Sequence, residues 1–188
     1  MATSRLDLDA TSSALLVIDV QERFLKVVPA IAADQVVGRN CRILLQAAGL
    51  LHIPRLISEQ YPAGLGPTFA HISEAAPEVP RLAKMHFSCA EDPAIAIAID
   101  QLGRQQLVIA GIEAHVCILT TAADLISRGY QVVIAGDAIA SREPSHVTMA
   151  IAALRDLGAL VLPTETIVMR WQREAGVGCF KALAQLIR

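Results

Sequence analysis

Short aliphatic runs alternate along the chain with longer stretches that have helical periodicity. The runs are rich in Ile, Leu, Val and Ala, as buried strands of a parallel sheet usually are, and they predict strands at 14–18, 55–58, 81–85, 106–110, 131–135 and 159–162. Apolar residues three and four positions apart indicate amphipathic helices, which we place at 32–51, 93–102, 115–128 and 144–157. This alternation predicts an α/β fold: a three-layer, Rossmann-like domain with a six-stranded, mainly parallel sheet and helices on both faces.

Proline and glycine positions agree with these boundaries. Pro93 suits the first turn of a helix, and Gly129 and Gly158 follow predicted helices as C-terminal caps. Thr164 is a plausible N-cap for a last helix. Residues 59–80 contain four prolines and two glycines, which predicts a long surface loop. No repeat or linker divides the chain, so we expect one domain over residues 1–188.

Composition narrows the classes of function. A formal net charge of −2 without a basic block argues against nucleic acid as a partner. The four cysteines form no CxxC pair, no secretory segment is evident, and no apolar run reaches the ~18 residues of a membrane span. We therefore expect a cytoplasmic protein that acts on a small molecule away from membranes. Apolar residues around Trp171 and Phe180 suggest a homo-oligomer.

Three reactive side chains follow predicted strands. In open parallel sheets, ligands bind beyond the carboxyl ends of the strands. Asp19 comes directly after the first strand, Lys84 lies at the end of the third, and Cys117 follows the fourth at the start of its helix. All three could therefore face one crevice. Each also has an ordinary structural interpretation: Asp19 as a turn residue, Lys84 as a solvated surface residue and Cys117 as a core residue.

The loop G-I-E-A-H-V-C gives Cys117 the setting of a nucleophile. Free backbone N–H groups and the positive end of a helix dipole favour thiolate over thiol, and an ammonium from Lys84 would lower the thiol pKa further. The Asp19 carboxylate could take the proton from sulfur and deliver it to a leaving group. The same N–H groups could form an oxyanion hole.

The segments LLVIDVQERF, ISEQYPAGLGPT, KMHFSC and VIAGIEAHVCILTTAADLISRGYQVVIAGDAIASR, at residues 15–24, 57–68, 84–89 and 108–142, resemble the isochorismatase-like cysteine hydrolases. Within that superfamily they look closest to the isochorismatase domain-containing group. The resemblance implies an Asp–Lys–Cys triad at Asp19, Lys84 and Cys117. It also implies a non-proline cis peptide bond between Ile112 and Glu113, which would turn the Glu113 N–H towards the oxyanion beside that of Cys117.

The resemblance further suggests two substrate-pocket residues and the absence of a cofactor. Phe24 matches the position of an aromatic ring that packs against a flat substrate, although it could equally be a core residue. The metal motif of the nicotinamidase branch, Asp-x-His, is replaced here by Ser58-Glu59-Gln60-Tyr61, so we expect no bound metal. Gln60 could instead hydrogen-bond a substrate, or be a solvated loop residue.

The leading functional hypothesis is hydrolysis of a small amide-like carbon–nitrogen substrate through a thioester. One alternative is isochorismatase-type hydrolysis of a vinyl ether, with Asp19 as the acid and no need for a thiol. Another is a non-catalytic module that binds a ligand or a protein partner.

Overall fold

The computed structural model describes residues 8–188 and contains one six-stranded sheet in the order β3-β2-β1-β4-β5-β6. Every neighbouring pair of strands is parallel, so the mainly parallel sheet predicted from the sequence is in fact all-parallel. The strands are β1 (Ser13–Ile18), β2 (Arg55–Gln60), β3 (Arg81–Lys84), β4 (Gln106–Ile112), β5 (Gln131–Ala140) and β6 (Leu160–Leu162).

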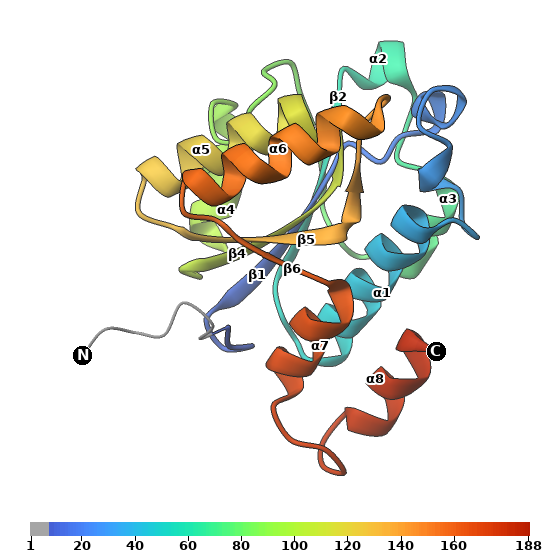
Figure 1. Ribbon diagram of the computed structural model, residues 1–188, viewed down its shortest axis with the longest axis vertical. Coiled ribbons are helices and arrows are strands. Elements are labelled where there is room, and N and C mark those ends of the chain that lie inside the picture. The colour runs from blue at the N-terminus through green and yellow to red at the C-terminus, as the bar shows by residue number, and fades with distance from the viewer. Residues whose placement is uncertain (1–7) are drawn as a thin grey trace.

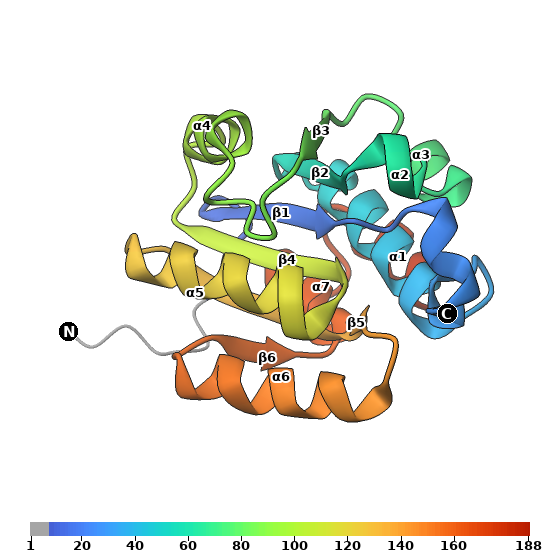
Figure 2. The ribbon, with the colours of Figure 1, turned by 90° about the horizontal axis from the view of Figure 1, so that it is seen from above.

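Helices cover both faces of the sheet (Figures 1 and 2). One core cluster packs α1, α3, α7 and α8 against the sheet, and a second packs α4, α5 and α6 against its other face. Their bounds are α1 (Val36–Leu50), α2 (Pro62–Leu65), α3 (Ala70–Ala75), α4 (Pro93–Gln101), α5 (Leu119–Ser127), α6 (Pro144–Asp156), α7 (Thr164–Gln172) and α8 (Phe180–Ile187). Two 3-10 turns, Glu22–Lys26 and Pro29–Ile31, precede α1. The predicted α/β fold is confirmed.

The structure corrects two details of the sequence analysis. Residues 59–80 are not one long loop, because they hold the end of β2 and the short helices α2 and α3, and Ile72 and Val79 are buried. Thr164 is not an N-cap but the first residue of α7. Its N–H and hydroxyl both donate to Asp137 Oδ1, at 2.7 Å each, so a side chain from β5 takes over the capping role.

The central strands bring distant residues to one edge of the sheet. Ile18, the last residue of β1, is paired with Ser58 of β2 on one side and with Gly111 of β4 on the other. A Cβ atom on Gly111 would lie 2.1 Å from the Ile18 carbonyl oxygen, and the residue has φ of +128°. The glycine at position 111 therefore allows β4 to approach β1 closely at Ile18, the residue that precedes Asp19.

The C-terminal segment packs on its own chain. Trp171 is 4% exposed and its indole N–H donates to Ser13 Oγ at 3.0 Å. Trp171 is therefore not part of an exposed apolar surface, and it does not support the expectation of a homo-oligomer. None of the helices formed by residues 8–188 is long and apolar enough to cross a membrane.

Candidate active site

Asp19 lies at the carboxyl end of β1 and is fully buried. Its backbone takes the left-handed conformation, with φ of +58°, and its N–H donates to the Ser58 carbonyl at 3.1 Å. The carboxylate accepts the Ser58 hydroxyl at Oδ1 and the Lys84 ammonium at Oδ2, both at 2.8 Å. The charge of Asp19 is thus balanced and its orientation is fixed from two neighbouring strands.

Lys84 ends β3 and is 1% exposed. Its ammonium donates to Asp19, to Gln60 Oε1 at 2.7 Å and to the Phe87 carbonyl at 3.2 Å, which uses all three protons. Burial is the largest single effect and works against the charged form, but the Asp19 carboxylate together with Cys89 and Cys117 outweighs it, and the pKa of Lys84 is raised. Lys84 is therefore a fixed cation and not a solvated surface lysine.

Gln60, the last residue of β2, holds Lys84 in place. Its Oε1 accepts the Lys84 ammonium, and its Nε2 donates to the Met85 carbonyl at 3.0 Å. Gln60 N–H donates to Gln21 Oε1 at 2.8 Å, and Gln21 Nε2 donates to the Gln60 carbonyl at 3.0 Å. Both ends of the Gln60 amide thus have protein partners; contact with a substrate stays a prediction.

Cys117, which follows β4, is the third candidate residue beside Asp19 and Lys84. It lies in a π-helical turn, residues 114–118, between β4 and α5, and it is 4% exposed. The Asp19 carboxylate acts electrostatically on its thiol. Burial, followed by the negative charge of Asp19, raises the pKa of Cys117 and outweighs the opposing charge of Lys84. The lowered thiol pKa expected from the sequence is therefore wrong, and the thiol is protonated at rest.

The turn before Cys117 has no cis peptide bond, contrary to the expectation for Ile112 and Glu113; no residue from 8 to 188 has one. The chain reverses here because Glu113 adopts the left-handed conformation, with φ of +54° and ψ of +56°. The Glu113 carbonyl then accepts the N–H groups of Val116 at 2.9 Å and Ile118 at 3.3 Å. In the sequence, Cys117 stands between the two residues that donate these hydrogen bonds.

Several residues around the turn were missed by sequence reasoning. Arg142 forms an ion pair with Glu113, and Ser141 Oγ is 3.0 Å from His115 Nδ1. His115 also stacks on His146 of α6, with ring centroids 4.3 Å apart. Ser141 and Arg142 directly follow β5 and lie in one of the segments that resemble the family. Their spacing in the sequence does not indicate which turn they contact.

Cys89 is a second buried thiol beside the cluster. Burial, followed by the negative charge of Asp19, raises its pKa to about 11, opposed in part by the charge of Lys84. Its backbone N–H donates to Thr121 Oγ1 of α5 at 2.9 Å.

Phe24 lies in the first 3-10 turn, partly buried against the α1 side of the core. Its contact with a substrate therefore stays a prediction. Among residues 8–188 no group of three or more His, Cys, Asp or Glu side chains is placed to hold a metal ion together. The arrangement that the structure does provide is a buried thiol, a buried carboxylate that acts on it electrostatically, and a lysine paired with that carboxylate.

Comparisons with known proteins find a matching family and several similar sequences and structures. Residues 13–166 match the isochorismatase domain family. Isochorismatase domain-containing protein 2A of Mus musculus is 38% identical over 181 residues, 94% of this chain and 83% of that protein. The secreted isochorismatase effector Isc1 of Phytophthora sojae is 33% identical over 192 residues, 100% of this chain and 90% of that protein. The structure of MAR1 ribonuclease from Caenorhabditis elegans superposes with a TM-score of 0.86 and 33% identity, over 95% of this chain and 91% of that one.

Proposed function

Because the chain belongs to the isochorismatase family, we propose that it is a cysteine hydrolase that cleaves a small, amide-like carbon–nitrogen bond through a thioester on Cys117. The observation that carries this proposal is the buried Asp19 carboxylate, which Lys84 holds at 2.8 Å and which acts electrostatically on the buried Cys117 thiol. A nucleophile, its base and a group that orients the base are the elements of covalent catalysis.

In the first half-reaction the thiol proton moves to Asp19 as sulfur attacks the carbonyl carbon. The protonated Asp19 then gives this proton to the nitrogen, the carbon–nitrogen bond breaks, and ammonia or an amine leaves. A resting thiol suits this sequence, because the thiolate forms only when a substrate carbon is ready to take the electron pair. Lys84 stays positively charged throughout and keeps the Asp19 carboxylate in its orientation through their hydrogen bond.

In the second half-reaction Asp19 takes a proton from water, whose oxygen attacks the thioester carbon. The carbon–sulfur bond breaks, the acid product leaves, and the proton returns to the Cys117 sulfur. We propose the Cys117 N–H as a donor to the oxyanion of both steps. This donor lies in the turn whose neighbouring N–H groups, those of Val116 and Ile118, are held by the Glu113 carbonyl.

The decisive experiment is an activity screen of small amides, ureas and carbamoyl compounds with Cys117→Ala and Asp19→Asn. We expect both substitutions to lower turnover by about three orders of magnitude or more. Cys41→Ala is the matched control, because Cys41 is also a buried cysteine but lies in the α1 core, and it should keep activity. Acid quenching during turnover should give a protein heavier by the acyl group, with the added mass on Cys117.

Two other activities are outcomes of the same screen. If Cys117→Ala still hydrolyses a vinyl ether while Asp19→Asn does not, the chain has isochorismatase-type chemistry. The likeness to MAR1 ribonuclease makes RNA the second substrate to test. We favour a small molecule because the net charge is −2 and Lys84, the cation at the site, is already paired with Asp19. Cleavage of RNA that disappears in Cys117→Ala would contradict this choice.

We also propose a reducing compartment and a homo-oligomer. The first is supported by the four cysteines, Cys41, Cys89, Cys117 and Cys179, which are all free thiols. The second is supported by Met85 and Phe87, which are 67% and 59% exposed next to Lys84. Measuring the molar mass in solution tests the oligomer.

A further inference from the structure

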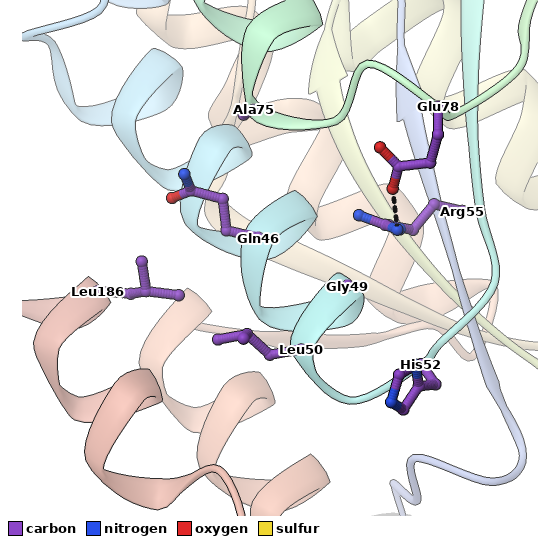
Figure 3. A pocket seen from close by; sticks show the side chains of 8 residues that line it. All are labelled: Gln46, Gly49, Leu50, His52, Arg55, Ala75, Glu78 and Leu186. Carbon is purple, nitrogen blue, oxygen red and sulfur yellow. Dashed lines mark hydrogen bonds and ion pairs between the residues drawn. The ribbon is translucent and has the colours of Figure 1, made fainter.

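A groove opens at the edge of the sheet opposite the candidate active site. It has a volume of about 600 Å³ and lies between the last turns of α1, the end of α3 and the end of α8. Figure 3 shows Leu186 of α8 facing Gln46 and Leu50 of α1, with Arg55 and Glu78 beyond Gly49. Arg55 begins β2, whereas the candidate catalytic groups follow the carboxyl ends of the strands, so the groove is a separate site.

Arg55 supplies the charge of the groove. Its side chain is 15% exposed, and one terminal nitrogen donates to the Leu45 carbonyl of α1 at 3.0 Å. The other terminal nitrogen pairs with Glu78, whose side chain is 61% exposed. The guanidinium is therefore anchored to the α1 backbone on one side, while an exposed carboxylate occupies the other.

Gly49 is the reason that Arg55 can lie across the end of α1. A Cβ atom at this position would lie 2.6 Å from a terminal nitrogen of Arg55. A glycine in a helix interior costs about 1 kcal/mol relative to alanine. Here the missing side chain leaves room for a guanidinium at the wall of the groove.

The Arg55–Glu78 pair separates the groove from a smaller hollow of about 310 Å³, which is lined on its far side by Pro54 and Pro80. Gly49, His52, Arg55 and Glu78 line both spaces. If Glu78 swings towards solvent, the two spaces join and Arg55 lies at their centre.

Two arginines, Arg55 and Arg81, favour an anion at the position of the Glu78 carboxylate. Arg81 also acts electrostatically on Glu78, and its guanidinium donates to four backbone carbonyls, of which that of Val79 is the nearest at 3.0 Å. Glu78 is thus one carboxylate near two arginines. When it leaves, a net positive charge stays at the groove.

We propose that this groove binds a small aliphatic carboxylate, which replaces Glu78 on the Arg55 guanidinium while its alkyl chain lies against Leu50, Ala75 and Leu186. Glu78 shows that the position accepts a carboxylate, and a planar guanidinium can hold one through two parallel hydrogen bonds. The apolar wall selects a ligand with a hydrocarbon body over a bare inorganic anion.

The test is a titration of the isotope-labelled protein with hexanoate, followed by the NMR shifts of amides in α1 and α8. We expect saturable shifts around Leu50 and Leu186 with a dissociation constant in the millimolar range. Glu78→Gln should bind about tenfold tighter because it removes the competing carboxylate. Glu74→Gln, which removes an exposed glutamate from α3, just before the turn that carries Glu78, should bind like the natural protein.

Two further variants test the role of Arg55. Arg55→Gln should lose binding, and Gly49→Ala should weaken it while the charge and the helix are kept. Hexylamine and hexanol supply the same alkyl chain without the carboxylate and should cause much smaller shifts. The proposal is overturned if hexanoate gives no saturable shifts in the Glu78→Gln protein, or if hexylamine binds there as well as hexanoate does.

Discussion

Arg142 holds the carboxylate of Glu113 at two points, with Nε 3.3 Å from Oε1 and a terminal nitrogen 3.2 Å from Oε2. Glu113 is 6% exposed and is the residue whose left-handed conformation turns the chain from β4 towards Cys117. The ion pair therefore ties the end of β5 to the turn that carries the candidate nucleophile. We infer that Arg142 is a positioning residue for Cys117.

Arg142→Gln should slow alkylation of Cys117 by iodoacetamide by about tenfold, because the turn loses its two-point support. Stability should change by no more than about 1 kcal/mol, since half of the arginine side chain is exposed. Glu113→Gln should have a similar effect, and the double variant should be no slower than either single one. Additive effects in this cycle would show that the two residues act independently.

The buried pair of Asp19 and Lys84 should be costly to break from one side. Lys84→Met leaves the carboxylate without its cation in a buried place, and we expect a loss of about 3–5 kcal/mol in the free energy of unfolding, measured in urea. Combining Lys84→Met with Asp19→Asn should restore much of that loss, because no charge is then buried. Arg173→Gln, which breaks an exposed ion pair with Asp9, should cost about 1 kcal/mol or less.

Gly111 should tolerate no side chain. An alanine Cβ would lie 2.1 Å from the Ile18 carbonyl, a backbone atom held in the sheet. We expect Gly111→Ala to lower the free energy of unfolding by about 2–4 kcal/mol and to reduce activity, because Ile18 precedes Asp19. Gly158→Ala separates the two causes: its φ is also positive, at +98°, but nothing lies within 4 Å. If both variants lose the same stability, the close approach of the strands is not the reason.

The fold was largely predictable because its strands are continuous aliphatic runs. A buried strand such as residues 106–110 needs apolar residues on both faces, and this pattern is visible without any tertiary information. The segment 59–80 was not predictable in the same way. One of its short helices, α3, is stabilised by the packing of Ile72 on the α1 side of the core, whereas the prolines and glycines of the segment alone indicate a loop.

For the candidate site, the sequence indicated which groups meet but not their protonation. Asp19, Lys84 and Cys117 each follow a strand, and parallel strands end at a common edge. The pKa of Cys117 depends instead on how completely the site is closed to water, which no spacing of residues reveals. The Arg142–Glu113 contact was equally hidden, because it joins the ends of β4 and β5 across 29 positions of sequence.

The raised pKa of the Cys117 thiol makes stability depend on alkaline pH. In the unfolded chain the thiol titrates near its ordinary pKa of 9.0, whereas burial and then the Asp19 charge raise this pKa in the folded protein. Above pH 9 the folded state therefore holds a proton that the unfolded state has lost. The free energy of unfolding should fall as pH rises, by at most about 1.4 kcal/mol per pH unit for this one thiol. Urea unfolding between pH 8 and about pH 10.5, a range that spans the ordinary thiol pKa, should show a shallower fall in Cys117→Ala. Ile118→Val removes a methylene from the neighbouring buried residue without removing a titrating group, so it should lower stability equally at every pH. A Cys117→Ala protein with the same pH slope as the natural one would mean that the folded thiol ionises as easily as an exposed one.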